Sequence, residues 1–68
     1  MNNLVSIITP SFNSSRFITE CIESVLNQTY KDWEMIIVDD YSEDNSRVII
    51  SEYADKDKRI KYIFLEKN

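Results

Sequence analysis

The chain has 68 residues, of which 8 are basic and 12 acidic, giving a formal net charge of −4 at pH 7. This length allows one domain at most, and so small a domain has little core to stabilise it. One cysteine and no histidine exclude an internal disulfide, a Ser/His/Asp triad and the common zinc sites. The acidic balance also argues against nucleic acid as a partner.

No targeting feature is recognisable in the sequence. The longest apolar runs fall far short of the ~20 residues that span a bilayer. The residues after Met1 lack the basic and apolar regions of a secretory signal. A lone cysteine is most simply a buried thiol in a reducing compartment. We therefore expect a soluble chain in the cytoplasm.

The first third of the chain predicts a strand followed by a helix. Residues 4–9 form a short apolar run, and we expect a buried strand that stops at Pro10, because proline cannot donate to a central ladder. Apolar side chains then recur at helical spacing through residues 14–28, where Asn13 or Ser14 is placed to cap the first N–H groups. The apolar positions of this helix are Phe17, Ile18, Cys21, Ile22, Val25 and Leu26.

The rest of the chain predicts a strand, a helix and a third strand. Residues 34–39 form a near-continuous apolar run, typical of a strand covered on both faces, and it closes in Asp39 and Asp40. Ser42 is expected to cap a helix that ends near Ala54. Residues 60–65 complete the pattern as a strand. The residues of the second helix expected to face the core are Val48, Ile49, Ile50 and Tyr53.

This order, β-α-β-α-β, indicates an α/β fold whose parallel strands are joined by right-handed crossovers, which is half of a doubly wound sheet. A 3-2-1 strand order places both helices on one face and leaves the other face bare. The order 2-1-3 places one helix on each face, and the sequence does not choose between the two. A bare apolar face needs a cover, and the simplest cover is more chain. We therefore expect these residues to be the first part of a larger domain.

The loops after the first two strands are the candidate binding site, because ligands of open parallel sheets bind outside the carboxyl ends of the strands. In the first loop, Pro10 would hold the backbone open and the ring of Phe12 could stack on a nucleobase. In the second, Asp40 could accept a hydrogen bond from a base N–H or a ribose hydroxyl.

Each of these features also has a purely structural explanation. Pro10 is consistent with a simple strand end, and Phe12 with a hydrophobic staple that packs before the helix. The pair of Asp39 and Asp40 is consistent with satisfying loop N–H groups and the start of the second helix. The same pair could ligate Mg²⁺ or Mn²⁺, although one acidic pair on one strand is a weak metal signal.

Three segments closely resemble, in order and spacing, the start of family 2 glycosyltransferases. They are VSIITPSFN at residues 5–13, IESVLNQTY at 22–30, and IIVDDYS at 36–42 followed by DNS at 44–46. The resemblance implies a GT-A fold, a nucleotide-sugar donor (commonly a UDP-sugar), and inversion at the sugar carbon assisted by a divalent cation such as Mg²⁺ or Mn²⁺.

The resemblance also implies roles for residues of both loops, which in this family hold the nucleoside. The Pro-x-aromatic-Asn loop corresponds to Pro10, Phe12 and Asn13. Pro10 and Phe12 would line the base pocket, with Phe12 stacking on the base. Asp40 would hydrogen-bond uracil or ribose, while Asp39 would chiefly brace the loop.

The chain departs from the family pattern at several positions. Tyr41 stands where glycine is usual, and we expect the turn to avoid positive φ because a tyrosine there would be strained. Glu43 stands where threonine is usual, and Phe12 where tyrosine is common. The family's metal-binding Asp-x-Asp, catalytic base and acceptor region, which would take a sugar or lipid-linked acceptor, match no residue here.

We therefore interpret residues 1–68 as the N-terminal nucleotide-binding part of a glycosyltransferase domain, either truncated or a natural gene fragment, and inactive alone. The alternative is a non-catalytic nucleotide-binding module, or a module that self-associates through its uncovered sheet face. A signalling receiver domain is disfavoured, because a whole strand and helix precede the acidic pair.

Overall fold

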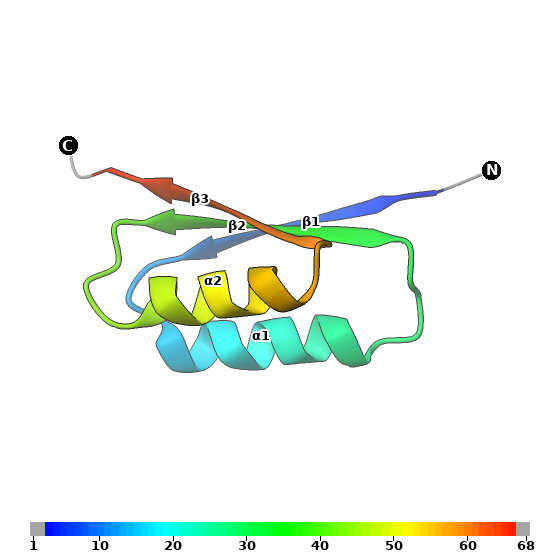
Figure 1. Cartoon of the computed structure of the whole chain (residues 1–68), viewed down its shortest axis with the longest axis horizontal. Coiled ribbons are helices and arrows are strands. Elements are labelled where there is room, and N and C mark those ends of the chain that lie inside the picture. Colours follow the sequence, from blue (N-terminus) through cyan, green and yellow to red (C-terminus); the bar gives the residue numbers. More distant parts are fainter. Residues whose placement is uncertain (1–2, 67–68) are drawn as a thin grey trace.

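A computed structural model describes residues 3–66, which form three strands and two helices in the predicted alternation (Figure 1). The elements are β1 (Val5–Ser11), α1 (Ser15–Asn27), β2 (Trp33–Asp40), α2 (Ser46–Lys56) and β3 (Ile60–Leu65). The three strands are parallel and lie in the order β1-β2-β3. The α/β fold class is therefore confirmed, and the strand order is the 3-2-1 alternative. All three carboxyl ends meet at one edge of the sheet.

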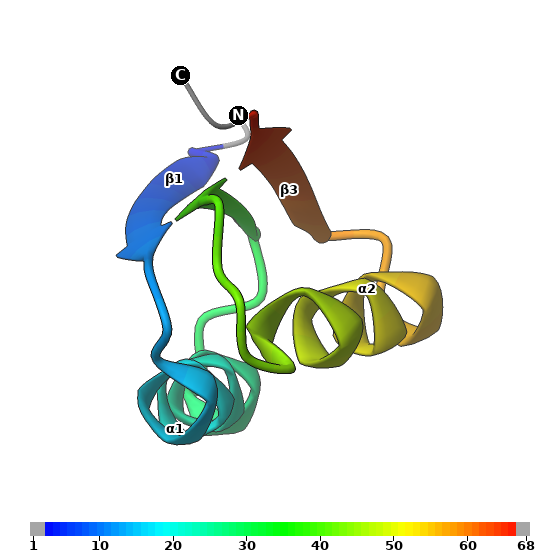
Figure 2. The ribbon, with the colours of Figure 1, turned by 90° about the vertical axis from the view of Figure 1, so that its left-hand side faces the viewer.

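Both helices pack against the same face of the sheet, as the 3-2-1 order requires (Figure 2). Burial along β2 alternates with the strand period of two, so that Trp33, Met35 and Ile37 point to the helices and are buried. They meet the helix residues Ile18 and Ile22. The complete buried apolar cluster is Ile18, Ile22, Trp33, Met35, Ile37, Ile50 and Ile60.

Two apolar positions of the predicted helices are exposed, as are Val5 and Ile8 of the first strand, which the sequence predicts to be buried. Phe17 of α1 is 59% exposed and Val48 of α2 is 57% exposed. In α1 the buried line runs through Ile18 and Ile22, four residues apart, and Phe17 lies off that line. In α2 the buried line runs through Ser46 and Ile50, four residues apart, and Val48 lies off that line.

The opposite face of the sheet carries no helix within residues 3–66. On this face Ile8 is 62% exposed and Ile63 is 52% exposed. At its far end from the carboxyl edge, the Glu34 carboxylate accepts hydrogen bonds from Ser6 Oγ at 2.6 Å and Lys61 Nζ at 3.1 Å. These two donors lower the pKa of Glu34. The uncovered face is thus apolar toward the carboxyl edge and polar at the other end.

Two predicted boundaries are wrong in ways that shape the site. β1 does not stop at Pro10 but continues to Ser11, with Pro10 paired to Val38. β1 is an edge strand among the described residues, where a missing N–H is tolerated. Ser42 does not cap α2, which begins at Ser46 after Asn45. The side chain of Ser42 is bonded to Asp39 instead.

Candidate functional site

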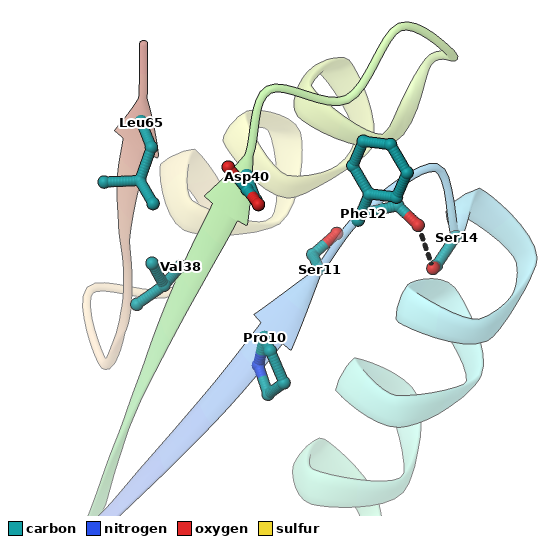
Figure 3. Close-up of a pocket in the computed structure, with 7 residues that line it drawn as sticks. All are labelled: Pro10, Ser11, Phe12, Ser14, Val38, Asp40 and Leu65. Atoms are coloured by element: carbon teal, nitrogen blue, oxygen red, sulfur yellow. Dashed lines mark hydrogen bonds between the residues drawn. The ribbon is translucent and has the colours of Figure 1, made fainter. Parts of the chain in front are cut away.

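A pocket of 430 Å³ opens at the carboxyl edge of the sheet, where the loops after β1 and β2 face each other (Figure 3). Its lining residues are Pro10, Ser11, Phe12, Ser14, Val38, Asp40 and Leu65. Of the residues predicted to bind a nucleotide, the structure therefore brings Pro10, Phe12 and Asp40 together on one pocket. The ring of Phe12 is 57% exposed, so it is not a staple packed before α1.

The sheet register explains why these side chains converge. Pro10 is paired with Val38, and Asp40 is paired with Leu65, so two neighbouring rows of the ladder end on the uncovered face. Alternation along β2 then turns Asp40 to the pocket and Asp39 to the helices. The result is an apolar floor with an aromatic ring on one side and a carboxylate on another.

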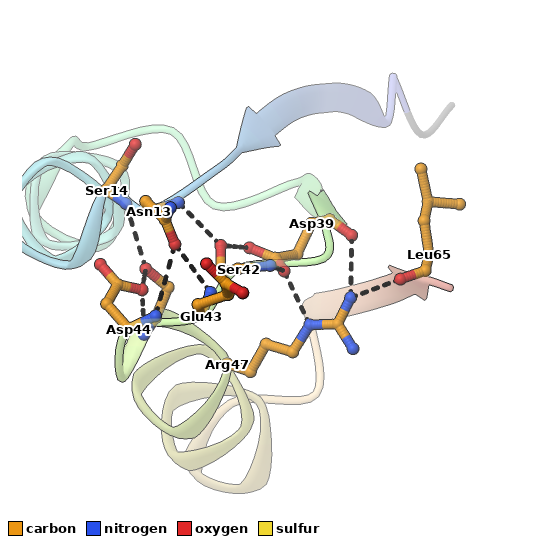
Figure 4. A network of polar contacts seen from close by, with 9 residues as sticks. Asn13, Ser14, Asp39, Ser42, Glu43, Asp44, Arg47 and Leu65 are labelled. Carbon is orange, nitrogen blue, oxygen red and sulfur yellow. Dashed lines mark hydrogen bonds and ion pairs between the residues drawn. The ribbon is translucent and has the colours of Figure 1, made fainter. Parts of the chain in front are cut away.

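Asp39 does not line the pocket; it is fully buried on the helix side (Figure 4). Its carboxylate accepts hydrogen bonds from the Ser42 backbone N–H at 2.9 Å and from Arg47 Nε at 2.7 Å. Burial alone would raise the pKa of Asp39, but the hydrogen bonds from Ser42 and Arg47 outweigh it and lower the pKa. Asp39 is therefore held as an anion in a closed polar network.

Asn13 also faces this network and not the pocket. Its Oδ1 accepts hydrogen bonds from the backbone N–H groups of Glu43 at 2.7 Å and Asp44 at 3.3 Å. Its own N–H donates to Ser42 Oγ at 2.8 Å. Asn13 has φ of 45°, a left-handed conformation that asparagine tolerates well. It thus locks the two loops together, and its assignment to nucleotide binding stays a prediction.

Tyr41 contradicts the expectation that the turn would avoid positive φ. Its φ is 58°, in the left-handed region that usually goes to glycine. The turn is imposed from both sides, because the N–H of Ser42 folds back onto Asp39 and the guanidinium of Arg47 lies 5.7 Å from the Tyr41 ring. A strained residue persists where its surroundings determine its conformation in this way.

Further hydrogen bonds join the N-termini of α1 and α2. Asp44 Oδ1 accepts from the Ser46 N–H at 2.9 Å, and Asp44 Oδ2 accepts from the Ser15 N–H at 3.3 Å. Ser46 Oγ, which is buried, accepts from the Ser14 N–H at 3.2 Å. Ser14 supplies no side-chain cap and donates its hydroxyl to the Phe12 carbonyl at 2.6 Å. The pocket loop is therefore fixed to both helices.

Sequence reasoning missed several residues of this site. Val38 and Leu65 line the pocket, and Arg47 joins the two strand ends behind it. Period-two alternation from Asp40 back to Val38 was a usable signal for the first of these. The roles of Leu65 and Arg47 depend on the strand order, which the sequence left open.

The divalent cation implied by the resemblance has no fitting site in the described part of the chain. Residues 3–66 contain no group of three or more Cys, Asp or Glu side chains placed to hold a metal ion. Asp39 and Asp40 point to opposite faces of β2, so the pair does not act as two ligands to one ion. Within residues 3–66, neither α1 nor α2 has the length and apolar character of a membrane-spanning helix.

Comparison with known proteins decides the family. The model of the family described as "Glycosyl transferase family 2" matches residues 6–68. The chain belongs to glycosyl transferase family 2. The chain is 49% identical over 65 residues to one curated relative, the putative teichuronic acid biosynthesis glycosyltransferase TuaG of Bacillus subtilis. It is 48% identical over 60 residues to the UDP-Glc:alpha-D-GlcNAc-diphosphoundecaprenol beta-1,3-glucosyltransferase WfgD of Escherichia coli.

The alignments cover most of this chain but a small part of its relatives. The alignment with TuaG covers 96% of this chain and 26% of TuaG. The alignment with WfgD covers 88% of this chain and 23% of WfgD. The mannosyltransferase PcManGT from Pyrobaculum calidifontis, solved in complex with GDP-Man and Mn²⁺, superposes with a TM-score of 0.75 at 23% identity. That superposition covers 94% of this chain and 19% of PcManGT, and it identifies the fold as GT-A.

Proposed function

We propose that these residues are the N-terminal nucleotide-binding segment of an inverting glycosyltransferase whose donor is a UDP-sugar. The proposal depends chiefly on one observation, that the Phe12 ring and the Asp40 carboxylate line the same pocket at the carboxyl edge of a parallel sheet. The name of WfgD, which specifies UDP-Glc, supports a uridine nucleotide over the guanosine nucleotide bound to PcManGT.

The pocket suits a nucleobase in shape and chemistry. The exposed face of Phe12 offers a stacking platform, and such stacking contributes roughly 1–3 kcal/mol per base. Pro10 and Val38 supply an apolar floor for the other side of the base. The Asp40 carboxylate accepts hydrogen bonds only, so when it faces N3 of the base it favours uracil, which presents N3–H, over cytosine, which offers its amino N4–H₂ beside an unprotonated N3.

The five residues predicted to hold the nucleotide divide into two roles. Pro10, Phe12 and Asp40 would touch the nucleoside, because they line the pocket. Asn13 and Asp39 would act indirectly, by fixing the loops that carry those three residues. Asp39 as a brace is the role that the resemblance implies, and the hydrogen bonds from Ser42 and Arg47 support it.

We propose that sugar transfer requires parts of the enzyme beyond these residues. Expelling a nucleoside diphosphate needs charge neutralisation at the phosphates and a base for the acceptor hydroxyl. The described residues supply no metal-holding cluster. The chain alone should therefore bind the nucleotide without transferring sugar. A sugar or lipid-linked acceptor, a role in polysaccharide synthesis as the name of TuaG suggests, and a cytoplasmic location all stay predictions.

The direct test is titration of this chain with UDP, followed by NMR, with CDP and GDP as comparisons. We expect UDP to shift the signals of Phe12 and Asp40 and to bind more tightly than CDP. Phe12→Ala should weaken UDP binding by roughly tenfold, in line with the loss of one stacked base. Phe17→Ala is the matched control, because Phe17 is equally exposed but lies on α1 outside the pocket.

Asp40→Asn provides the second arm of the test, since the amide can donate to the cytosine N3. We expect this variant to lose most of the preference for UDP over CDP. Asp55→Asn, an exposed carboxylate on α2, is its control and should leave the preference unchanged. If none of the three nucleotides perturbs Phe12 or Asp40 in the unmodified chain, the proposed function is wrong.

The second candidate function is self-association through the uncovered sheet face. Three exposed apolar side chains on that face, Ile8, Ile63 and Leu65, favour it. Sedimentation equilibrium would give twice the chain mass in that case, and Ile63→Lys should return the monomer mass. A monomer at high protein concentration would rule self-association out.

A further inference from the structure

Arg47, in the first turn of α2, joins the carboxyl ends of two strands behind the pocket (Figure 4). Its Nε donates to the buried Asp39 carboxylate at 2.7 Å. Its Nη2 donates to the Asp39 backbone carbonyl at 3.3 Å and to the Leu65 carbonyl at 2.6 Å. One guanidinium therefore connects the last residues of β2 and β3 to each other and to α2.

The two strand ends that Arg47 joins are also two walls of the pocket. Asp40 follows Asp39 directly, Leu65 is paired with Asp40 at the end of the ladder, and both line the pocket. Beyond this row the described part of the β2–β3 ladder has no further pairs. Arg47 thus adds the last bonds that join these two walls, at the open end of the ladder where backbone pairing stops with Asp40 and Leu65.

We propose that Arg47 is a positioning residue that sets the width of the nucleoside pocket by holding the Asp40 and Leu65 walls together. The expected effect of Arg47 on nucleotide binding rests on the proposed function, whereas its expected effect on the width of the pocket does not. Among residues 3–66 the hydrogen bonds of Arg47 reach the Asp39 carboxylate and the Leu65 carbonyl and no side chain that lines the pocket, so Arg47 acts through these two groups.

The guanidinium geometry is essential to this role. Arginine presents several donors in a rigid plane, so one side chain reaches a carboxylate and two carbonyls at once. The plane also lies against the Phe64 ring, with Cζ 4.6 Å from the ring centroid, which fixes its orientation. A lysine would retain the charge opposite Asp39 but not the fixed bridge to Leu65.

The test compares Arg47→Gln and Arg47→Lys with Arg59→Gln. Arg59 is a matched control, because it also bonds an aspartate (Asp57) and a backbone carbonyl and stacks on an aromatic ring (Trp33, 3.9 Å). It precedes β3, at the end of the sheet away from the pocket. Both glutamine substitutions leave the chain with the same net charge, and Arg47→Lys keeps the positive charge near the pocket, so it separates lost attraction for an anionic ligand from the lost bridge.

Two readouts are measured at a temperature where thermal melting shows every variant to be folded. The first is the positions of the Val38 and Leu65 methyl NMR signals without ligand, which report pocket shape. The second is the dissociation constant for UDP. We expect Arg47→Gln to move both methyl signals and to weaken UDP binding roughly fivefold or more, while Arg59→Gln does neither. Arg47→Lys should recover most of the melting temperature but little of the UDP affinity, and it replaces Arg47→Gln should that variant not fold.

The outcomes separate the two hypotheses. If the unmodified chain binds no nucleotide, the proposed function fails, and the methyl signals alone decide whether Arg47 shapes the pocket. Unmoved methyl signals in the Arg47 variants would overturn the inference even where UDP binds. An equal loss of UDP affinity in the Arg47 and Arg59 variants would overturn it too, because the effect would then follow from stability or charge.

Discussion

The two sides of the loops at the carboxyl edge have opposite character, although neighbouring residues supply them. Phe12 and Asp40 face an open pocket, whereas Asn13 and Asp39, the next or preceding residues, face a closed network of hydrogen bonds. Phe12 and Asp40 on the pocket side are exposed, whereas on the network side Asp39 is fully buried and Asn13 is exposed. The comparison indicates that pocket lining and loop support are divided between adjacent positions, with support on the helix side.

The largest difference in stability should appear when the same substitution, Asp to Asn, is made separately at each member of the acidic pair. Asp39→Asn removes the charge-assisted bond to Arg47 and should cost about 2 kcal/mol of unfolding free energy. A domain of this size has roughly 3–10 kcal/mol in total, so the loss is large. Asp40→Asn should stay within about 0.5 kcal/mol, because its side chain is exposed. Urea denaturation measures both, and equal losses would contradict the division of roles.

The equivalent pair in the first loop should show a smaller contrast. Asn13→Ala removes the acceptor for the Glu43 and Asp44 N–H groups and places alanine at φ 45°, for a cost of about 1–2 kcal/mol. Asn13→Gly relieves the backbone and should recover part of this loss. Phe12→Ala should leave stability within about 0.5 kcal/mol. If Phe12→Ala destabilises the chain as much as Asn13→Ala, the ring is part of the packing and not of a binding surface.

Much of this arrangement follows from the sequence, and the remainder depends on contacts across the chain. Apolar periodicity predicted all five elements and brought Phe12 and Asp40 to one edge. The choice of strand order depends on which face the helices cover, and local patterns do not encode it. The partners of Asn13 lie about thirty residues away in the second loop, so no spacing rule pointed to them. Similarly, the left-handed Tyr41 follows from bonds made by its neighbours.

Low pH should remove the stability that Asp39 contributes, and with it the difference between the two members of the acidic pair. The pKa of Asp39 is lower in the folded chain than in the unfolded one, where it is about 3.9. Its stabilisation is therefore complete above that value and is lost as the pH falls through the folded pKa. The stability difference between the unmodified chain and Asp39→Asn should shrink steadily below about pH 4. Denaturation curves at a series of pH values test this, and a constant difference would show that the Asp39 charge does not contribute.

The smallest effect is expected at Tyr41, which lies between the two sides and carries the backbone strain of the turn. A glycine at this position adopts φ of 58° without strain. The Tyr41→Gly chain is more flexible when unfolded, however, and it lacks the contact between the ring and Arg47. These terms oppose each other, so Tyr41→Gly should change stability by less than about 1 kcal/mol. Tyr41→Val also loses the ring contact, yet valine is β-branched and fits the left-handed region poorly. We therefore expect valine to be less stable than glycine by about 1–2 kcal/mol. Equal stability of the two variants would mean that the turn relaxes out of the left-handed region, and the Asp39–Ser42 bond would then not be what holds Tyr41 there.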